Sequence, residues 1–230
     1  MEKKKNDFIA QGSILAIASI LVRVMGMIYR IPMTAIIGDK GNGFYSYAYS
    51  VYTILLLLSS YSLPLAVSKM VSAKAQLGQW RNVKRVFICA IAFAIGIGTT
   101  FGLIVLIGAQ FFTRVFFHSE LAAIALRFMA PTILIMALLG VFRGFFQGLQ
   151  NTLPTAVSQI VEGLINAIMS VVFAYFLFDF GHGMDAAGGT TDLGYAWGAA
   201  GGAIGTGAGA LAGLIFCFIL FVAYRKILAV

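Results

Sequence analysis

The segment ILAIASILVRVMGMIYRIPMTAII, residues 14–37, decides the fold, because it is a long apolar run that contains only two charged side chains. Both are arginines, Arg23 and Arg30. A helix of this length crosses the hydrocarbon core of a bilayer, which takes about 20 residues. A guanidinium group stays ionised, so an arginine inside such a helix needs a partner, water or an anion. We therefore expect both side chains to face a hydrated cavity that attracts an anionic substrate.

A structural interpretation of the two arginines is also open. A long basic side chain near the end of a span can extend its charged group to the membrane interface. This alternative is stronger for Arg30, near the outer end of the run, than for Arg23, near its middle. Placing an arginine at the centre of a span costs at least about 2.5 kcal/mol, which favours a functional reason for Arg23.

The composition of the whole chain is that of a polytopic membrane protein. Of its 230 residues, 60% are hydrophobic and 10% are charged, and the mean hydropathy is +0.95. Soluble domains carry about 25% charged residues. The net charge of +8 arises from basic residues in short segments between apolar runs, which is typical of membrane topology signals. We expect the membrane, and no nucleic acid, as a partner.

Six apolar segments are long enough to span a bilayer. Pro32 predicts a kink near the outer end of the first. The predicted fold class is an all-α polytopic membrane protein, in which residues 1–230 form a single six-helix lobe. The predicted spans cover approximately residues 8–37, 44–67, 86–109, 121–146, 155–178 and 194–224.

Basic residues concentrate in alternate connections between these spans. The opposite connections carry little positive charge, namely Lys40 and Arg114. The positive-inside rule therefore predicts that both termini are cytoplasmic. The residues on the predicted inner side are Lys3, Lys4, Lys5, Lys69, Lys74, Arg81, Lys84, Arg85, Arg225 and Lys226.

Two connections have a second interpretation. Residues 68–85 interleave apolar and basic side chains, so they could form an amphipathic helix on the inner leaflet, although a plain topology signal explains them more simply. The fifth connection places Asp179, His182 and Asp185 at a spacing that could hold a metal only if the segment were helical. Its glycines predict a flexible outer loop instead, so we expect no metal site.

Polar groups inside the later spans predict contacts between helices. Arg143 near the inner end of the fourth span and Glu162 in the fifth lie at similar depth, so we expect a buried ion pair, with a role in substrate or proton handling as the alternative. In the sixth span glycines recur every four residues and predict close helix packing, or a face that slides during transport. These glycines are Gly201, Gly205, Gly209 and Gly213.

Four stretches of the sequence together resemble one family. They are RVMGMIYRIP (residues 23–32), GFYSYAYSVY (43–52), LPLAVSKMVS (63–72) and FRGFFQGLQNTLPTAVSQIVEG (142–163). In order and spacing they are similar to the polysaccharide biosynthesis and stage V sporulation protein B group. That group is related to the lipid II flippases and belongs to the multidrug/oligosaccharidyl-lipid/polysaccharide exporter superfamily.

The resemblance implies a fold and a function. Members have two bundles of six helices around a central cavity, and they move undecaprenyl-pyrophosphate-linked sugars across the bacterial cytoplasmic (inner) membrane. This chain resembles the first bundle only, so we expect it to be the N-terminal lobe of a longer MATE-like transporter, or to pair with a second copy. Arg23 and Arg30 match the first-helix arginines that are thought to hold the pyrophosphate, a role that suits guanidinium groups.

Some residues depart from the proteobacterial lipid II flippases. The separation of Arg23 and Arg30 is one residue longer, Ile31 stands where those proteins carry an aspartate, and the second span has Ser59, Ser60 and Ser62 in place of an arginine. These differences favour the sporulation-type branch.

Three functions follow as hypotheses. The first is a flippase or exporter of lipid II or another lipid-linked, anionic cell-envelope polysaccharide precursor, working by alternating access, with no enzyme activity and no cofactor. The second is a multidrug or cation antiporter of the same superfamily, against which the positive cavity counts. The third is a membrane scaffold in spore or envelope assembly.

Overall fold

A computed structural model describes the backbone of residues 2–188 and 192–228 and the side chains of residues 12–186 and 192–223. In these residues the chain is helical apart from short turns, which confirms the all-α fold class. The helices are α1 (Glu2–Ser59), α2 (Leu63–Gln76), α3 (Trp80–Phe117), α4 (Ala122–Gly148), α5 (Leu153–Gly188) and α6 (Leu193–Leu228).

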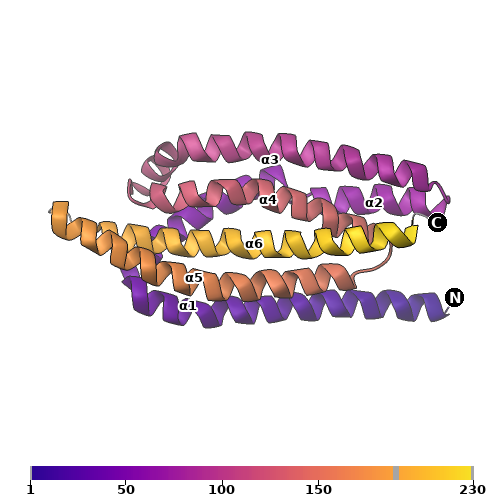
Figure 1. Ribbon diagram of the computed structural model, residues 1–230, viewed down its shortest axis with the longest axis horizontal. Coiled ribbons are helices and arrows are strands. Elements are labelled where there is room, and N and C mark those ends of the chain that lie inside the picture. Colours follow the sequence, from indigo (N-terminus) through magenta and orange to yellow (C-terminus); the bar gives the residue numbers. More distant parts are fainter. Residues whose placement is uncertain (1, 189–191, 229–230) are drawn as a thin grey trace.

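Helix α1 reverses direction at Gly38 and so holds the first predicted span and most of the second. Gly38 has φ 63° and ψ −177°, a conformation that is open to glycine and strained for other residues. We call residues 2–37 the first arm and residues 39–59 the second arm; they lie along the bundle in opposite directions (Figure 1). The reversal is thus made at Gly38, and Pro32 stays inside the helix of the first arm.

A turn at residues 60–62 interrupts the second predicted span, 44–67. The second arm ends at Ser59, and α2 begins after three intervening residues with Pro64 in its first turn, a position that suits proline. Leu63, Val67 and Val71 bury one face of α2. Because α2 continues along the bundle beside α4, residues 68–76 do not form a helix that lies across the bundle end (Figure 1).

The other four predicted spans fall on α3, α4, α5 and α6, with the fourth beginning one residue before α4. In the described residues five segments are long and apolar enough to cross a membrane, and the first of them, Gly12–Gln76, joins both arms of α1 with α2. The beginning of α1 and the end of α6 lie at the same end of the bundle, which we call the termini end (Figure 1). The basic side chains that the topology prediction places before residue 12 and after residue 223 lie outside the described side chains.

Helix α4 forms the centre of the bundle, and its buried residues take part in two apolar clusters. One cluster, toward Gly38, includes Met33, Ile37, Tyr45, Leu126 and Ile133. The other, toward the termini end, includes Val67, Phe87, Phe142 and Phe146. The outward faces of the long helices carry exposed apolar side chains, as the contact with lipid requires.

The glycines of α6 lie where this helix meets α5. A Cβ atom placed on Gly201 or Gly205 would collide with the backbone of Ala174 or Ser170, and one on Gly209 would lie 2.6 Å from the carbonyl oxygen of Glu162. On Gly213 the nearest atoms are 3.4 Å away. Three of the four predicted packing glycines therefore stand where no side chain fits, and helices α5 and α6 approach backbone to backbone.

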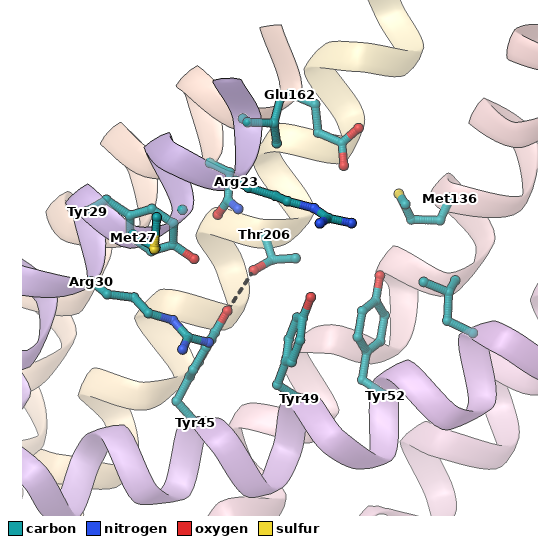
Figure 2. Close-up of a pocket in the computed structure, with 15 residues that line it drawn as sticks. Arg23, Met27, Tyr29, Arg30, Tyr45, Tyr49, Tyr52, Met136, Glu162 and Thr206 are labelled. Atoms are coloured by element: carbon teal, nitrogen blue, oxygen red, sulfur yellow. Dashed lines mark hydrogen bonds between the residues drawn. The ribbon is translucent and has the colours of Figure 1, made fainter. Parts of the chain in front are cut away.

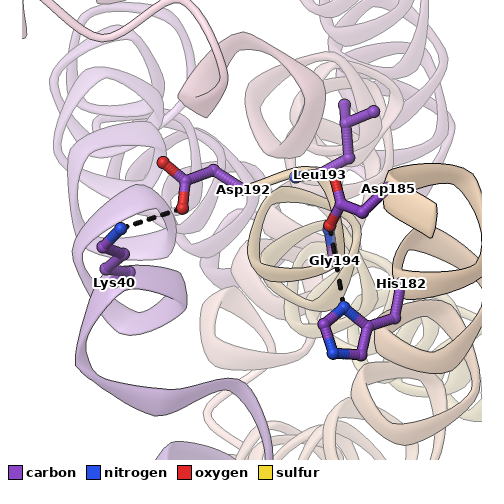
Figure 3. A network of polar contacts seen from close by, with 6 residues as sticks. All are labelled: Lys40, His182, Asp185, Asp192, Leu193 and Gly194. Atoms are coloured by element: carbon purple, nitrogen blue, oxygen red, sulfur yellow. Dashed lines mark hydrogen bonds and ion pairs between the residues drawn. The ribbon is translucent and has the colours of Figure 1, made fainter. Parts of the chain in front are cut away.

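The predicted flexible loop after the fifth span is wrong for residues 179–188, because α5 continues to Gly188. Asp185 explains how the next helix starts: its carboxylate accepts hydrogen bonds from the backbone N–H groups of Leu193 (3.0 Å) and Gly194 (2.9 Å), which lie at the start of α6 (Figure 3). His182 Nδ1 is 3.7 Å from Asp185 Oδ2. Within the described part of the chain no three His, Cys, Asp or Glu side chains are placed to hold a metal ion.

A second polar contact joins the hairpin of α5 and α6 to the reversal of α1 at Gly38. Lys40, two residues after Gly38, forms an ion pair with Asp192, with 2.9 Å between Nζ and Oδ1 (Figure 3). Its ammonium group also lies 5.9 Å from the ring centroid of Tyr195. The pair is solvent-exposed, so it positions the hairpin more than it stabilises the fold.

Candidate functional site

A cavity of about 580 Å³ lies between the two arms of α1 and helices α4, α5 and α6 (Figure 2). Its size is within the range of small-molecule sites, about 300–1,000 Å³. Basic, phenolic and amide side chains line it together with apolar ones. The lining residues are Val22, Arg23, Gly26, Met27, Tyr29, Arg30, Tyr45, Tyr49, Tyr52, Leu56, Met136, Glu162, Gly163, Asn166 and Thr206.

Arg23 and Arg30 both line this cavity from the first arm. They are seven residues apart, about two helical turns, so they lie on one face of the helix. Gly26 and Met27 lie between them on the cavity wall. Neither guanidinium forms a salt bridge with a described acidic side chain. The first arm therefore presents two uncompensated positive charges to the cavity.

Glu162 is the acidic residue among the lining side chains, and its charge is balanced by Arg143, which is not part of the cavity lining. Arg143 Nη2 lies 2.7 Å from Glu162 Oε2, and Arg143 Nε donates a hydrogen bond of 2.9 Å to Ser158 Oγ. The side chains are 12% and 24% exposed, respectively. Because Arg143 neutralises Glu162, the cavity keeps the net positive charge of Arg23 and Arg30.

Breaking this pair is expected to destabilise the fold. Arg143→Met leaves the Glu162 carboxylate half-buried without a partner, and we expect a loss of about 2–4 kcal/mol in the free energy of unfolding. The double variant Arg143→Met/Glu162→Gln should lose less than the sum of the two single changes, as measured by a double-mutant cycle in detergent.

The control for this cycle is the ion pair of Arg114 and Glu120, which is 3.5 Å long with side chains 72% and 57% exposed. Arg114→Met should change the free energy of unfolding by less than about 0.5 kcal/mol. Equal effects of Arg143→Met and Arg114→Met would show that the inner pair contributes nothing beyond a surface contact.

Three tyrosines of the second arm form the wall opposite the arginines, and sequence reasoning did not single them out. Tyr45, Tyr49 and Tyr52 recur at intervals of four and three residues, which places them on one helix face. Their hydroxyl groups point into the cavity (Figure 2). The signal was present in the stretch GFYSYAYSVY, where helical spacing separates these three residues from Tyr47.

The fold and the cavity define an all-helical, multi-pass membrane protein with a cationic, polar pocket between its helices. A family model described as polysaccharide biosynthesis protein matches residues 8–228. The chain belongs to this polysaccharide biosynthesis protein family, as its motifs indicated.

Three curated relatives come from Bacillus subtilis (strain 168). Stage V sporulation protein B is 26% identical over 96% of this chain and 40% of its own length. The lipid II flippase MurJ is 27% identical over 67% of this chain and 30% of its own length. The uncharacterized membrane protein YabM is 26% identical over 80% of this chain and 34% of its own. The chain thus spans less than half the length of these relatives, and no solved structure matches it.

Proposed function

We propose that this chain is one lobe of a flippase or exporter for undecaprenyl-pyrophosphate-linked oligosaccharides, such as lipid II or another precursor of a cell-envelope polysaccharide. Arg23 and Arg30 hold the pyrophosphate of the substrate, and the lobe alternates between inward-open and outward-open states. The prenyl tail stays in the lipid. No covalent step is needed, so the proposed protein is a transporter and not an enzyme.

The observation that carries this proposal is the pair of uncompensated arginines in a cavity between membrane-spanning helices. Guanidinium groups bind phosphate oxygens through paired, charge-assisted hydrogen bonds. Two such groups about two turns apart on one helix suit a ligand with two linked phosphates. The positive charge also counts against a cationic substrate, which the cavity would repel.

The proposed transport path needs a second wall. The other wall is a further lobe of the same protein or a second copy of this chain. We place the protein in the bacterial cytoplasmic membrane with the termini end in the cytoplasm, because Lys74, Arg81, Lys84 and Arg85 lie at or near the adjoining ends of α2 and α3.

Reconstitution tests the proposal. The product of the whole gene is placed in liposomes with fluorescent undecaprenyl-pyrophosphoryl N-acetylglucosamine, and a membrane-impermeant quencher reports how much lipid changes leaflet. We expect movement well above that of protein-free liposomes, and no effect on the neutral lipid undecaprenol. Movement of neither lipid by a folded protein would contradict the proposed function.

A further inference from the structure

The second arm of α1 presents hydroxyl groups, not ring faces, to the cavity. The rings of Tyr45 and Tyr49 stack with centroids 5.8 Å apart, and those of Tyr49 and Tyr52 are tilted with centroids 5.9 Å apart. The faces of these rings therefore contact one another. What remains for a ligand is the row of phenol groups that Figure 2 shows pointing from the second arm toward the wall of Arg23.

Within this row, the hydroxyl group of Tyr52 is the best candidate for binding a ligand. Its side chain is buried, with 3% of the residue exposed, yet it lines the cavity. The Tyr45 hydroxyl lies 3.3 Å from Thr206 Oγ1, whereas no described residue is hydrogen-bonded to the hydroxyl of Tyr52. Among the described residues, the fully buried side-chain atoms without a hydrogen-bond partner are Thr132 Oγ1 and Gln159 Oε1, so the unpaired hydroxyl of Tyr52 is open to the cavity, where water or a ligand can bind it.

We propose that Tyr49 and Tyr52 bind the hydroxyl groups of the sugar next to the pyrophosphate. The inference rests on the proposed function and names the part of the substrate that the tyrosines of the second arm bind. A phenol both donates and accepts hydrogen bonds and carries no charge, which matches a sugar hydroxyl. The arginines only donate and are charged, which matches a phosphate.

This arrangement divides the recognition of one headgroup between the two arms of α1. The pyrophosphate lies on the first arm and the sugar on the second, and the two arms meet at Gly38. A ligand that contacts both arms fixes their separation, whereas a lipid pyrophosphate without a sugar contacts the first arm alone. The second arm thereby selects glycosylated lipids.

Binding measurements with two lipids test this inference. The product of the whole gene, in nanodiscs, is titrated with undecaprenyl pyrophosphate and with undecaprenyl-pyrophosphoryl N-acetylglucosamine. Tyr52→Phe should weaken binding of the glycosylated lipid about tenfold, the loss of one hydrogen bond of ~1.4 kcal/mol, and leave the affinity for undecaprenyl pyrophosphate within about twofold. Tyr49→Phe should do the same. UDP-N-acetylglucosamine, which has the same sugar pyrophosphate without the prenyl chain, should bind more weakly than the lipid.

Tyr47→Phe is the matched control, because Tyr47 is on the same arm but stacks on Phe117 and does not line the cavity. It should change neither affinity. Equal losses for both lipids in Tyr52→Phe would place the phenol on the phosphates and overturn the inference, as would no loss for either lipid while Arg23→Ala weakens both. Binding of neither lipid by the wild type would overturn the proposed function together with the inference, and UDP-N-acetylglucosamine binding as tightly as the lipid would replace the lipid with a soluble ligand.

Discussion

Arg23→Glu is expected to reduce transport of a lipid-linked pyrophosphate at least about 100-fold while the protein stays folded. The change removes charge-assisted hydrogen bonds, each of which contributes about 1.5–3 kcal/mol, and places a negative charge against the phosphates. Arg23 has no salt-bridge partner among the described residues, so its loss orphans no internal charge. The measurement is the quenching assay in liposomes, with the circular dichroism spectrum as the check on folding.

The control variant is Arg114→Glu, which changes the same charge at an exposed position outside the cavity. It should transport at the wild-type rate. The competing functions predict other results for Arg23→Glu, since a cation exporter would keep or gain activity and a scaffold would be unaffected. Either result, obtained with a folded protein, would show that Arg23 does not bind a lipid-linked pyrophosphate.

Gly205→Val is expected to have the largest effect on stability, a loss of at least about 3 kcal/mol in the free energy of unfolding. A side chain at this position meets the backbone of Ser170 on α5, and backbone atoms cannot move aside as a flexible side chain can. Separating α6 from α5 would also break the hydrogen bond from Ser170 Oγ to the Gly202 carbonyl oxygen, which is 3.3 Å long. Thermal unfolding in detergent measures the effect.

Gly96→Val provides the comparison, because a Cβ atom at Gly96, on the exposed surface of α3, has no neighbour within 4 Å. Both variants replace a helical glycine with valine, so the difference between them isolates packing from helix propensity. If Gly205→Val and Gly96→Val unfold at the same temperature, α5 and α6 do not meet through their glycines in the membrane.

Most of the fold could be predicted from the sequence, because long apolar runs are a strong signal of membrane-spanning helices. The positions that could not be predicted depend on single residues. Gly38 reverses the chain within one residue, and nothing in the sequence around it distinguishes it from the other glycines. The glycines after residue 180 predicted a loop, but α5 continues to Gly188. In this segment Asp185 caps the following helix, a tertiary contact between residues that are eight apart in sequence.

Of the two facing walls of the cavity, only the one with the arginines of the first arm was predicted from the sequence. Arg23 and Arg30 stand out because a charge in an apolar run is costly, and the structure brings both to one cavity. The tyrosines of the second arm did not stand out, since aromatic residues are common in membrane helices and their hydroxyl groups acquire meaning only when the wall opposite them is known. The role of the arginines in binding a substrate remains a prediction.

Photo-crosslinking inside the cavity tests the central claim most directly. Benzoylphenylalanine is placed at Met27, which lines the cavity with 66% of its surface exposed, or at Ile107, which lies on α3 with 79% exposed and outside the cavity. Irradiation with undecaprenyl-pyrophosphoryl N-acetylglucosamine should give a covalent adduct at position 27 that an excess of unlabelled lipid suppresses and Arg23→Ala abolishes. Equal labelling at positions 27 and 107, insensitive to Arg23→Ala, would mean that the lipid headgroup does not enter this cavity.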